Sequence, residues 1–343
     1  MSRRLQEIVD GTARLGPETV HIDVTNGCNT NCITCWDHSP LLAVARSASW
    51  KRKRVDPAEV ETLLDDLVAL GGLRNIILSG MGEPFTHPAI YAMIEAVKRR
   101  RLHLTIITNL IPADEQRIIE LGVDTLLIGI HGASEAAYRA FHPSFRSDEW
   151  RILHRMLAAF RDAGRRDKHV QVVCASNAEE VPEMVRLAHR YRAGQLNYKL
   201  ASLREGTEAC RISEAQRDWL VAEGVPAAVG LARELGVSTN LDVFAAQLAA
   251  GGEATAKMAD VGCYMGHVYA RVLVDGTVLY CCNTEVVVGS LSEARFSELW
   301  RGARWDAWRA RMRAGDYLPS CAQCGKLNQN VKIARKLRAF AGQ

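Results

Sequence analysis

The sequence predicts an α/β fold in which helices cover a parallel sheet, followed by a smaller domain of different character. Two observations carry this prediction. Short, nearly continuous apolar runs alternate with amphipathic helical patterns from about residue 20 to residue 236, as in a sheet buried on both faces. The alternation then stops, and a hairpin pattern with several cysteines begins at Cys263. The sheet is either open and doubly wound or a complete or partial barrel.

Six strand–helix alternations are expected along the first part of the chain. The strands are predicted at 20–26, 75–80, 104–109, 125–130, 170–176 and 196–202. The helices are predicted at 56–72, 87–100, from 113, at 150–163, 180–191 and from 213. The helix at 56–72 has the clearest boundaries. Asp56 can cap it, Pro57 suits its first turn, and Gly71 or Gly72 can end it.

The chain is expected to divide into four segments. These are an amino-terminal extension (1–16), a core (17–205), a linking helical segment (206–255) and a carboxyl-terminal domain (256–343). In the last segment, "VYARVLVDGTVLYCC" predicts a hairpin with Asp275 and Gly276 as its two-residue turn. Only 27 residues precede Cys28, from which we expect no amino-terminal peptide-recognition domain.

Composition narrows the class of protein. Apolar residues make up 48% and charged residues 24% of the 343 residues, which is ordinary for a soluble domain. The opening segment has no apolar core of a secretory signal, and no apolar run is long enough to span a membrane. A cytoplasmic location is therefore expected. Thiols stay reduced there, so the ten cysteines point to metal ligands or redox chemistry rather than disulfides.

Basic residues gather locally, although the net charge of +4 is too small to indicate nucleic-acid binding. "WKRKR" at 50–54 is one such segment, and the chain after Cys324 is another. A solvated surface explains both, and docking of an acidic substrate or an electron-donor protein is the alternative.

Three cysteines lie within "CNTNCITCW", at Cys28, Cys32 and Cys35. A four-iron cluster held by three cysteines keeps one iron open to an external ligand. Zinc is the alternative, because His38 could complete a site of three cysteines and one histidine. Spacing leaves both open. The loop, however, follows the first strand, "GMGEP" follows the second, and Thr108 ends the third. All three features belong at one edge of the sheet, which favours a catalytic site over a structural zinc site.

"CNTNCITCW" closely resembles the C-x3-C-x2-C-aromatic signature of the radical SAM superfamily. "SGMGEP" is similar to the Gly-Gly-Glu motif of that family, and with "TNL" the resemblance covers roughly residues 17–205. It implies a partial six-stranded (β/α) barrel. It also implies a [4Fe–4S] cluster on Cys28, Cys32 and Cys35, whose open iron S-adenosylmethionine chelates through its amino and carboxylate groups.

The resemblance also assigns the contacts of S-adenosylmethionine. Gly82 and Glu83 meet the amino group, with Glu83 as partner of the ammonium. Trp36 is expected to contact the adenine. The ribose or the carboxylate is expected to contact Thr108, Asn109 and His131. Met81 departs from the family's usual glycine, and "GIHGAS" from its Ser-x-Asp pattern. The structural alternatives are capping of the helix after Pro88 by Glu83 and turn chemistry at Thr108 and Asn109.

The second cysteine group resembles a SPASM domain, an auxiliary-cluster module of many radical SAM enzymes. Cys263, Gly276 and Cys281 fit its opening C-x(9–15)-G-x4-C, and "CAQC" supplies Cys321 and Cys324. Asn330 stands at the next cysteine position, so the pattern resembles the shortened Twitch form. This implies one fully ligated auxiliary [4Fe–4S] cluster that carries electrons or holds structure. A four-cysteine zinc site is the alternative.

Cys282 has no ligand role in this pattern. If Cys281 faces the cluster, Cys282 is expected to face elsewhere, since adjacent strand residues alternate. It is a candidate hydrogen-atom donor to a substrate radical, and an inert buried thiol is the alternative. Lys199 and His131 lie at strand ends and are expected to be salt-bridged or solvated rather than substrate contacts.

The resemblance implies an enzyme that cleaves S-adenosylmethionine to a 5′-deoxyadenosyl radical, which abstracts hydrogen from the substrate. A single auxiliary cluster favours a polar carbohydrate or aminocyclitol-like small molecule that undergoes net oxidation or epimerisation. Radical modification of a ribosomal peptide is the alternative. A zinc-binding nucleic-acid interaction protein is a remote alternative, because it leaves "GMGEP" without a role. A flavodoxin- or ferredoxin-type electron donor is expected as a partner.

Overall fold

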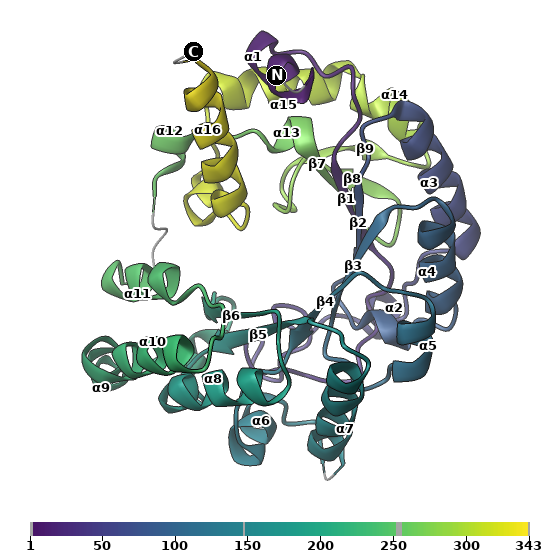
Figure 1. Cartoon of the computed structure of the whole chain (residues 1–343). Helices are drawn as coiled ribbons and strands as arrows, with labels where there is room; N and C mark the ends of the chain where they lie inside the picture. The colour runs from purple at the N-terminus through teal and green to yellow at the C-terminus, as the bar shows by residue number, and fades with distance from the viewer. Residues whose placement is uncertain (1–2, 147, 252–255, 342–343) are drawn as a thin grey trace.

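The computed structural model describes residues 3–146, 148–251 and 256–341, and these contain one nine-stranded sheet of order β6-β5-β4-β3-β2-β1-β7-β8-β9. Its first six strands are β1 (Thr19–Asp23), β2 (Asn75–Ser79), β3 (His103–Thr108), β4 (Thr125–Gly129), β5 (Lys168–Val173) and β6 (Gln195–Leu200). They pair in parallel and follow one another in chain order. The strands curve into an open arc with helices on its outer side (Figure 1). This confirms the predicted partial barrel.

The described helices are α1 (Arg3–Asp10), α2 (Ala48–Lys51), α3 (Pro57–Leu70), α4 (Ile90–Arg99), α5 (Glu115–Glu120), α6 (Glu135–Phe141), α7 (Glu149–Asp162), α8 (Val181–Arg190), α9 (Glu214–Trp219), α10 (Val225–Glu234), α11 (Leu241–Ala249), α12 (Met258–Val261), α13 (Met265–Val268), α14 (Phe296–Trp300), α15 (Ala303–Arg313) and α16 (Leu327–Ala341). The Asp56 carboxylate caps α3 by accepting from the Ala58 amide, and Gly71 ends that helix at a φ of 78°, as expected. Among the described residues, no helix has the length and hydropathy that crossing a bilayer requires.

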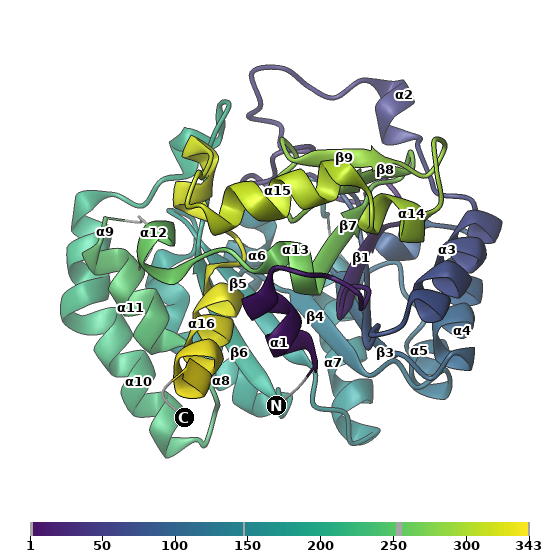
Figure 2. The same cartoon turned by 90° about the horizontal axis from the view of Figure 1, so that it is seen from above.

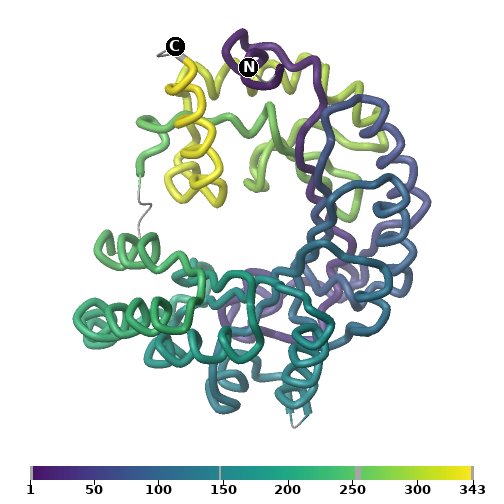
Figure 3. Tube along the Cα trace, in the orientation of Figure 1, coloured from purple at the N-terminus to yellow at the C-terminus, as the bar shows by residue number. Residues whose placement is uncertain are grey.

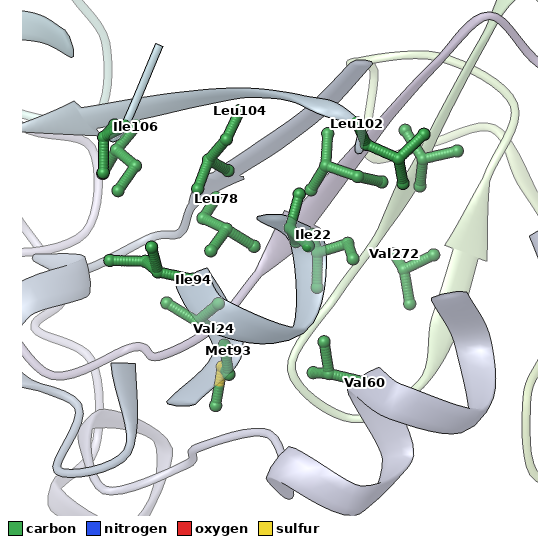
Figure 4. Close-up of a cluster of buried hydrophobic side chains, with 14 of the residues drawn as sticks. Ile22, Val24, Val60, Leu78, Met93, Ile94, Leu102, Leu104, Ile106 and Val272 are labelled. Atoms are coloured by element: carbon green, nitrogen blue, oxygen red, sulfur yellow. The ribbon is translucent and has the colours of Figure 1, made fainter. Parts of the chain in front are cut away.

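Apolar side chains of the strands and of the outer helices form the main core. Figure 4 shows Ile22 of β1, Leu78 of β2 and Ile106 of β3 packed with Met93 and Ile94 of α4. All five are buried. This packing holds the carboxyl ends of the strands in fixed relative positions, which is what a site built on their loops requires.

The carboxyl-terminal domain extends the same sheet. Strand β7 (Tyr269–Val272) pairs in parallel with β1, and β8 (Thr277–Leu279) and β9 (Val287–Ser290) continue as antiparallel strands. The predicted hairpin is therefore present, but its turn differs. The Leu273 amide donates to the Thr277 carbonyl and the Gly276 amide to the Leu273 carbonyl, which leaves a three-residue loop. Gly276 has a φ of 79°, the left-handed conformation that such loops need.

A buried ion pair joins the two parts of the sheet. The Asp23 carboxylate of β1, only 1% exposed, accepts from Nε and Nη2 of Arg271 in β7 at 2.9 and 2.8 Å. We expect Asp23→Asn to lower the free energy of unfolding by about 3 kcal/mol or more, because Arg271 then keeps a largely buried charge without a carboxylate. Urea unfolding of the iron-loaded protein measures this change.

The matched control is Asp275→Asn, which breaks the exposed pair between Lys53 and Asp275. Its expected cost is below about 1 kcal/mol. Equal losses in the two variants would show that the Asp23–Arg271 pair adds nothing beyond a surface contact.

Candidate functional site

The loops after β1, β2 and β3 meet at the carboxyl edge of the sheet, as the sequence predicted. The Gly27 carbonyl accepts from the Glu83 amide at 2.8 Å and from the Thr86 hydroxyl at 3.1 Å. The Asn109 side-chain amide donates to the Asn29 side chain at 2.8 Å. The cysteine loop is thus hydrogen-bonded to both neighbouring loops.

Glu83 lies at the centre of this junction. Its carboxylate, 3% exposed, accepts from the Thr108 hydroxyl at 2.6 Å, the Asn109 amide at 2.7 Å and the Phe85 amide at 3.2 Å. The bond from Phe85 makes Glu83 the cap of the short 3-10 turn Pro84–Thr86. The structural alternative, capping of the helix after Pro88, is wrong, because the N-cap of α4 is Ala89. Burial raises the pKa of Glu83 to about 7, against the lowering effect of these hydrogen bonds. A buried carboxyl group that ionises near neutrality is suited to a cationic ligand.

Gly82 allows the first two loops to approach each other. A Cβ at this position would lie 2.1 Å from the Gly27 carbonyl oxygen, which no side chain tolerates. The preceding residue, Met81, has no such restriction, and its carbonyl is within 3.0 Å of Nε2 of His38. His38 thereby has its Nε2 engaged away from the cysteines, which weakens the zinc alternative.

Cys28, Cys32 and Cys35 lie on one loop, are all partly buried, and influence one another's ionisation. Burial raises the pKa of Cys28 to about 12, and burial raises the pKa of Cys32 well above its ordinary value, with Cys35 and Cys28 adding to that increase. Neighbouring thiolates repel one another, so all three cysteines ionise together only when positive charge is supplied. The iron of a [4Fe–4S] cluster binds thiolates and supplies that charge. A four-iron cluster binds each thiolate through a different iron. Among the described residues, no three Cys, His, Asp or Glu side chains converge on a single ion position.

Trp36 extends from the cysteine loop toward β6. Its indole Nε1 donates to the Ser202 carbonyl at 2.6 Å, and the Arg204 guanidinium lies 3.7 Å from the ring centroid. The side chain is 39% exposed. Trp36 therefore links the cysteine loop to the segment after β6, and its contact with adenine stays a prediction.

His131 follows β4 and has a φ of 65°. Its Nδ1 accepts from the Val172 amide at 3.0 Å, so the proton of the neutral ring is on Nε2. Burial lowers the pKa of His131 well below its ordinary value, and Lys199 contributes to that lowering. The ring lies 4.4 Å from that of Phe141. Among the described residues His131 therefore has no ion-pair partner. It is a partly exposed, neutral ring that its backbone contact and Phe141 hold in place.

The cysteines of the carboxyl-terminal domain also lie together. Burial raises the pKa of Cys263 to about 12, with contributions from Cys324 and Cys321. The Cys281 sulfur accepts from the Asn283 amide at 3.4 Å. Asn330, at the position of the missing cysteine, is fully buried. It accepts from the Tyr264 amide at 2.8 Å and faces the Cys324 sulfur at 4.0 Å, so it holds two cysteine-bearing segments together.

Cys282 does not face away from this group. Strand β8 ends at Leu279, so strand alternation does not extend to the two cysteines, and their thiols hydrogen-bond to each other. A Cβ at Gly325 would lie 3.3 Å from the Cys282 sulfur. The expectation of opposite faces is therefore wrong. Five cysteines surround the auxiliary site, one more than a fully ligated four-iron cluster takes.

Three cations lie near Cys282, and the sequence did not single them out as a group. Lys326 has its ammonium 4.0 Å from the Tyr269 ring centroid, Arg271 pairs with Asp23, and Lys199 is at the end of β6. The Lys199 side chain is exposed, but the protein around it partly removes water from the ammonium and so lowers its pKa. The nearby Cys282 raises that pKa and partly offsets the lowering. Among the described residues, Lys199 has no ion-pair partner, so of the two expected states, salt-bridged or solvated, its exposure agrees with the second. No single-sequence pattern could have joined these distant positions.

Comparisons with known proteins agree with this geometry. The family model of the radical SAM superfamily matches residues 22–188, and that of the SPASM iron-sulfur cluster-binding domain matches residues 263–325. A curated relative is the AdoMet-dependent heme synthase of Methanosarcina barkeri, 24% identical over 84% of this chain and 83% of its own.

Two solved structures have the same fold. Streptococcus suis SuiB bound to precursor peptide SuiA superposes with a TM-score of 0.65 at 14% identity, over 96% of this chain and 74% of SuiB. The enzyme anSMEcpe with bound AdoMet and Cp18Cys peptide gives 0.64 at 13% identity, over 95% of this chain and 99% of its own.

The chain belongs to the radical SAM superfamily and carries a SPASM-type iron–sulfur domain at its carboxyl end. It is therefore a radical SAM enzyme that uses S-adenosylmethionine, a [4Fe–4S] cluster and an auxiliary iron–sulfur centre. This membership confirms the resemblance seen in the sequence and decides against the zinc-binding nucleic-acid protein.

Proposed function

We propose that Cys28, Cys32 and Cys35 hold the cluster that binds S-adenosylmethionine, and that the auxiliary cluster takes its four ligands as predicted, from Cys263, Cys281, Cys321 and Cys324. When bound, the reduced cluster and S-adenosylmethionine supply a 5′-deoxyadenosyl radical that abstracts a hydrogen atom from the substrate. The mutual effect of the three partly buried thiols on one another's pKa supports the first assignment.

The chain's own residues position S-adenosylmethionine. Glu83 accepts a hydrogen bond from its amino group, while Gly82 keeps the loop close enough for this contact. The hydrogen bonds that Thr108 and Asn109 make to Glu83 hold the carboxylate in place, and Nε2 of His131 is a donor for the ribose or carboxylate. Trp36 is the proposed adenine neighbour.

The substrate class follows from the charge of the region between β6 and the carboxyl-terminal domain. Lys199, Lys326 and Arg271 are grouped there, and of these Arg271 is paired with a carboxylate. These three cations are the observation that carries the proposal of a polar small molecule bearing a negative charge, such as an acidic carbohydrate. The ammonium of an aminocyclitol would be repelled. The reaction is a net oxidation or an epimerisation.

Modification of a ribosomal peptide is the second candidate. Both structural neighbours were solved with peptides bound, and an acidic peptide suits the same cations. The electron donor is proposed to be a flavodoxin- or ferredoxin-type protein. Basic residues on α16 offer it a docking surface, since Lys332, Arg335 and Lys336 are partly or fully exposed.

The test offers acidic sugars, aminocyclitols and acidic peptides to the anaerobic, iron-loaded enzyme and measures 5′-deoxyadenosine. We expect acidic substrates alone to raise its formation. Lys199→Met should raise KM for the active substrate by about tenfold or more, whereas Lys168→Met, at the opposite end of the neighbouring strand, should not. Preference for the aminocyclitol would overturn the proposed charge selectivity.

The role of Cys282 distinguishes an epimerisation from a net oxidation. If Cys282 donates a hydrogen atom in an epimerisation, product formed in D₂O carries deuterium and Cys282→Ala stops turnover after abstraction. If the product is two electrons more oxidised and Cys282→Ala is active, the reaction is a dehydrogenation.

S-adenosylmethionine binding should depend on pH through Glu83. In the folded protein the pKa of Glu83 is about 7, above the ordinary value of 4.5. The protonated carboxyl group therefore contributes fully to the stability of the ligand-free fold below pH 4.5. That contribution is lost as the pH rises toward 7. The amino group of the ligand needs the ionised carboxylate as its hydrogen-bond acceptor. We therefore expect affinity to rise from pH 6 to pH 8, by up to about tenfold. Equilibrium dialysis measures it, and Glu83→Gln should abolish the pH dependence.

A further inference from the structure

A second pocket lies away from the candidate site. It has a volume of about 700 Å³ and is bounded by the segment after α1, by α13, and by α15 with the residue that ends α14. The lining residues are Gly11, Thr12, Ala13, Arg14, His267, Arg301, Asp306, Arg309, Ala310 and Arg313. Figure 2 shows α1, α13 and α15 side by side, and Figure 3 traces the amino-terminal segment alongside the carboxyl-terminal domain. None of the lining residues belongs to the proposed cluster or S-adenosylmethionine site.

The pocket is strongly basic. Four of its lining residues are arginines, and among the described residues neither the Arg14 side chain nor the Arg301 side chain has an ion-pair or hydrogen-bond partner. Nη2 of Arg313 donates a hydrogen bond to the Val9 carbonyl at 2.8 Å. The one lining carboxylate, Asp306, is already bonded to Nη1 of Arg309 at 2.7 Å. The pocket therefore has excess positive charge that no described side chain neutralises.

Arg309 forms the floor of this pocket and is incompletely paired. Its side chain is 95% or more buried, at 4% exposure. Nε donates to the Gly266 carbonyl at 2.9 Å and Nη1 to the Trp300 carbonyl at 2.9 Å, while Nη2 is buried without a partner. Buried guanidinium nitrogens normally have acceptors. The nearby Glu7 carboxylate is engaged elsewhere, with the Leu15 amide and Arg3. The guanidinium also lies 4.4 Å from the Trp300 ring centroid, so Arg309 adds a buried positive charge to the wall of the pocket.

We propose that this pocket binds a small polyanion that carries phosphate groups, of the diphosphate or polyphosphate class. Arginine is suited to phosphate because its planar fork donates two parallel hydrogen bonds. The volume falls within the usual range of small-ligand sites. Apart from His267, no lining residue has a ring on which a base could stack, so recognition rests on the phosphate groups themselves.

Such a ligand would connect the two ends of the chain. Arg14 belongs to the segment before β1, whereas Arg301, Arg309 and Arg313 belong to the carboxyl-terminal domain. Without an anion these cations repel one another across the pocket. A polyanion binds the folded arrangement and not the unfolded chain, so it raises the temperature of unfolding by an amount that grows with the logarithm of its concentration above Kd.

The test measures binding of inorganic pyrophosphate, and separately of tripolyphosphate, to the iron-loaded full chain by calorimetry and thermal unfolding. We expect saturable binding that weakens with salt. The double variant Arg14→Gln/Arg301→Gln should lose about tenfold or more in affinity, and its unfolding temperature should no longer rise with pyrophosphate. Both side chains are exposed and unbonded in the described structure, so the variant is expected to fold.

The control is Arg304→Gln/Arg233→Gln, which removes two exposed arginines outside the pocket, one of them on α15 itself. Unchanged affinity in this control supports the site. Equal losses in the two double variants, or no saturable binding of either probe, overturn it. If the polyphosphates fail but poly-glutamate binds through Arg14 and Arg301, the pocket is a docking site for an acidic protein and not for a small polyanion.

Discussion

Cys32→Ala is expected to remove the catalytic cluster and all 5′-deoxyadenosine formation. Cys32 is the most enclosed of the three cysteines: burial raises its pKa well above normal, with Cys28 and Cys35 adding to that increase. A [4Fe–4S] cluster left with two cysteine ligands on this loop is not retained. Iron should fall from about eight to about four atoms per chain, because the auxiliary cluster has separate ligands. Iron and acid-labile sulfide analysis after anaerobic purification measures this.

Cys210→Ala is the matched control. Its thiol is also buried and packs beside the same loop, with the sulfur 3.6 Å from the Ile33 carbonyl. This variant should keep about eight irons and its activity. A Cys32→Ala protein that retained full iron content and formed 5′-deoxyadenosine would disprove the assignment of the three cysteines.

Glu83→Gln is expected to weaken S-adenosylmethionine binding by about 30-fold or more, equivalent to about 2 kcal/mol, since the charge-assisted bond from the amino group to the carboxylate is lost. The fold should survive. The glutamine oxygen can still accept from the Asn109 amide, and the Thr108 hydroxyl can accept instead of donate. Iron content should stay at the wild-type value, which separates this effect from loss of the cluster.

Asp124→Asn gives the comparison for Glu83→Gln. Asp124 is also a carboxylate that accepts a backbone amide, from Leu104 at 2.8 Å, but it lies at the opposite edge of the sheet. Its substitution should leave S-adenosylmethionine affinity unchanged. If Glu83→Gln lowers the unfolding temperature yet binds S-adenosylmethionine normally, Glu83 only ties the ends of β2 and β3 together.

Much of the fold and the location of the site followed from local patterns. Apolar runs of strand length and the capping of α3 by Asp56 are properties of short segments, so the six core strands were predicted to within three residues at each end. The three loops could be assigned to one edge because parallel strands share their carboxyl ends. The cysteine spacing and "GMGEP" then identified the class of enzyme.

The sequence by itself therefore determined the core fold, the class of enzyme and the position of its site. Only the tertiary structure decided that Glu83 is hydrogen-bonded to Thr108 and Asn109, that Cys282 lies beside Cys281, and that Lys199, Lys326 and Arg271 share one region. The four arginines of the second pocket come together in the same way. These contacts join residues from distant parts of the chain. Their distances depend on how strands and domains pack, which no local pattern of apolar and polar residues specifies.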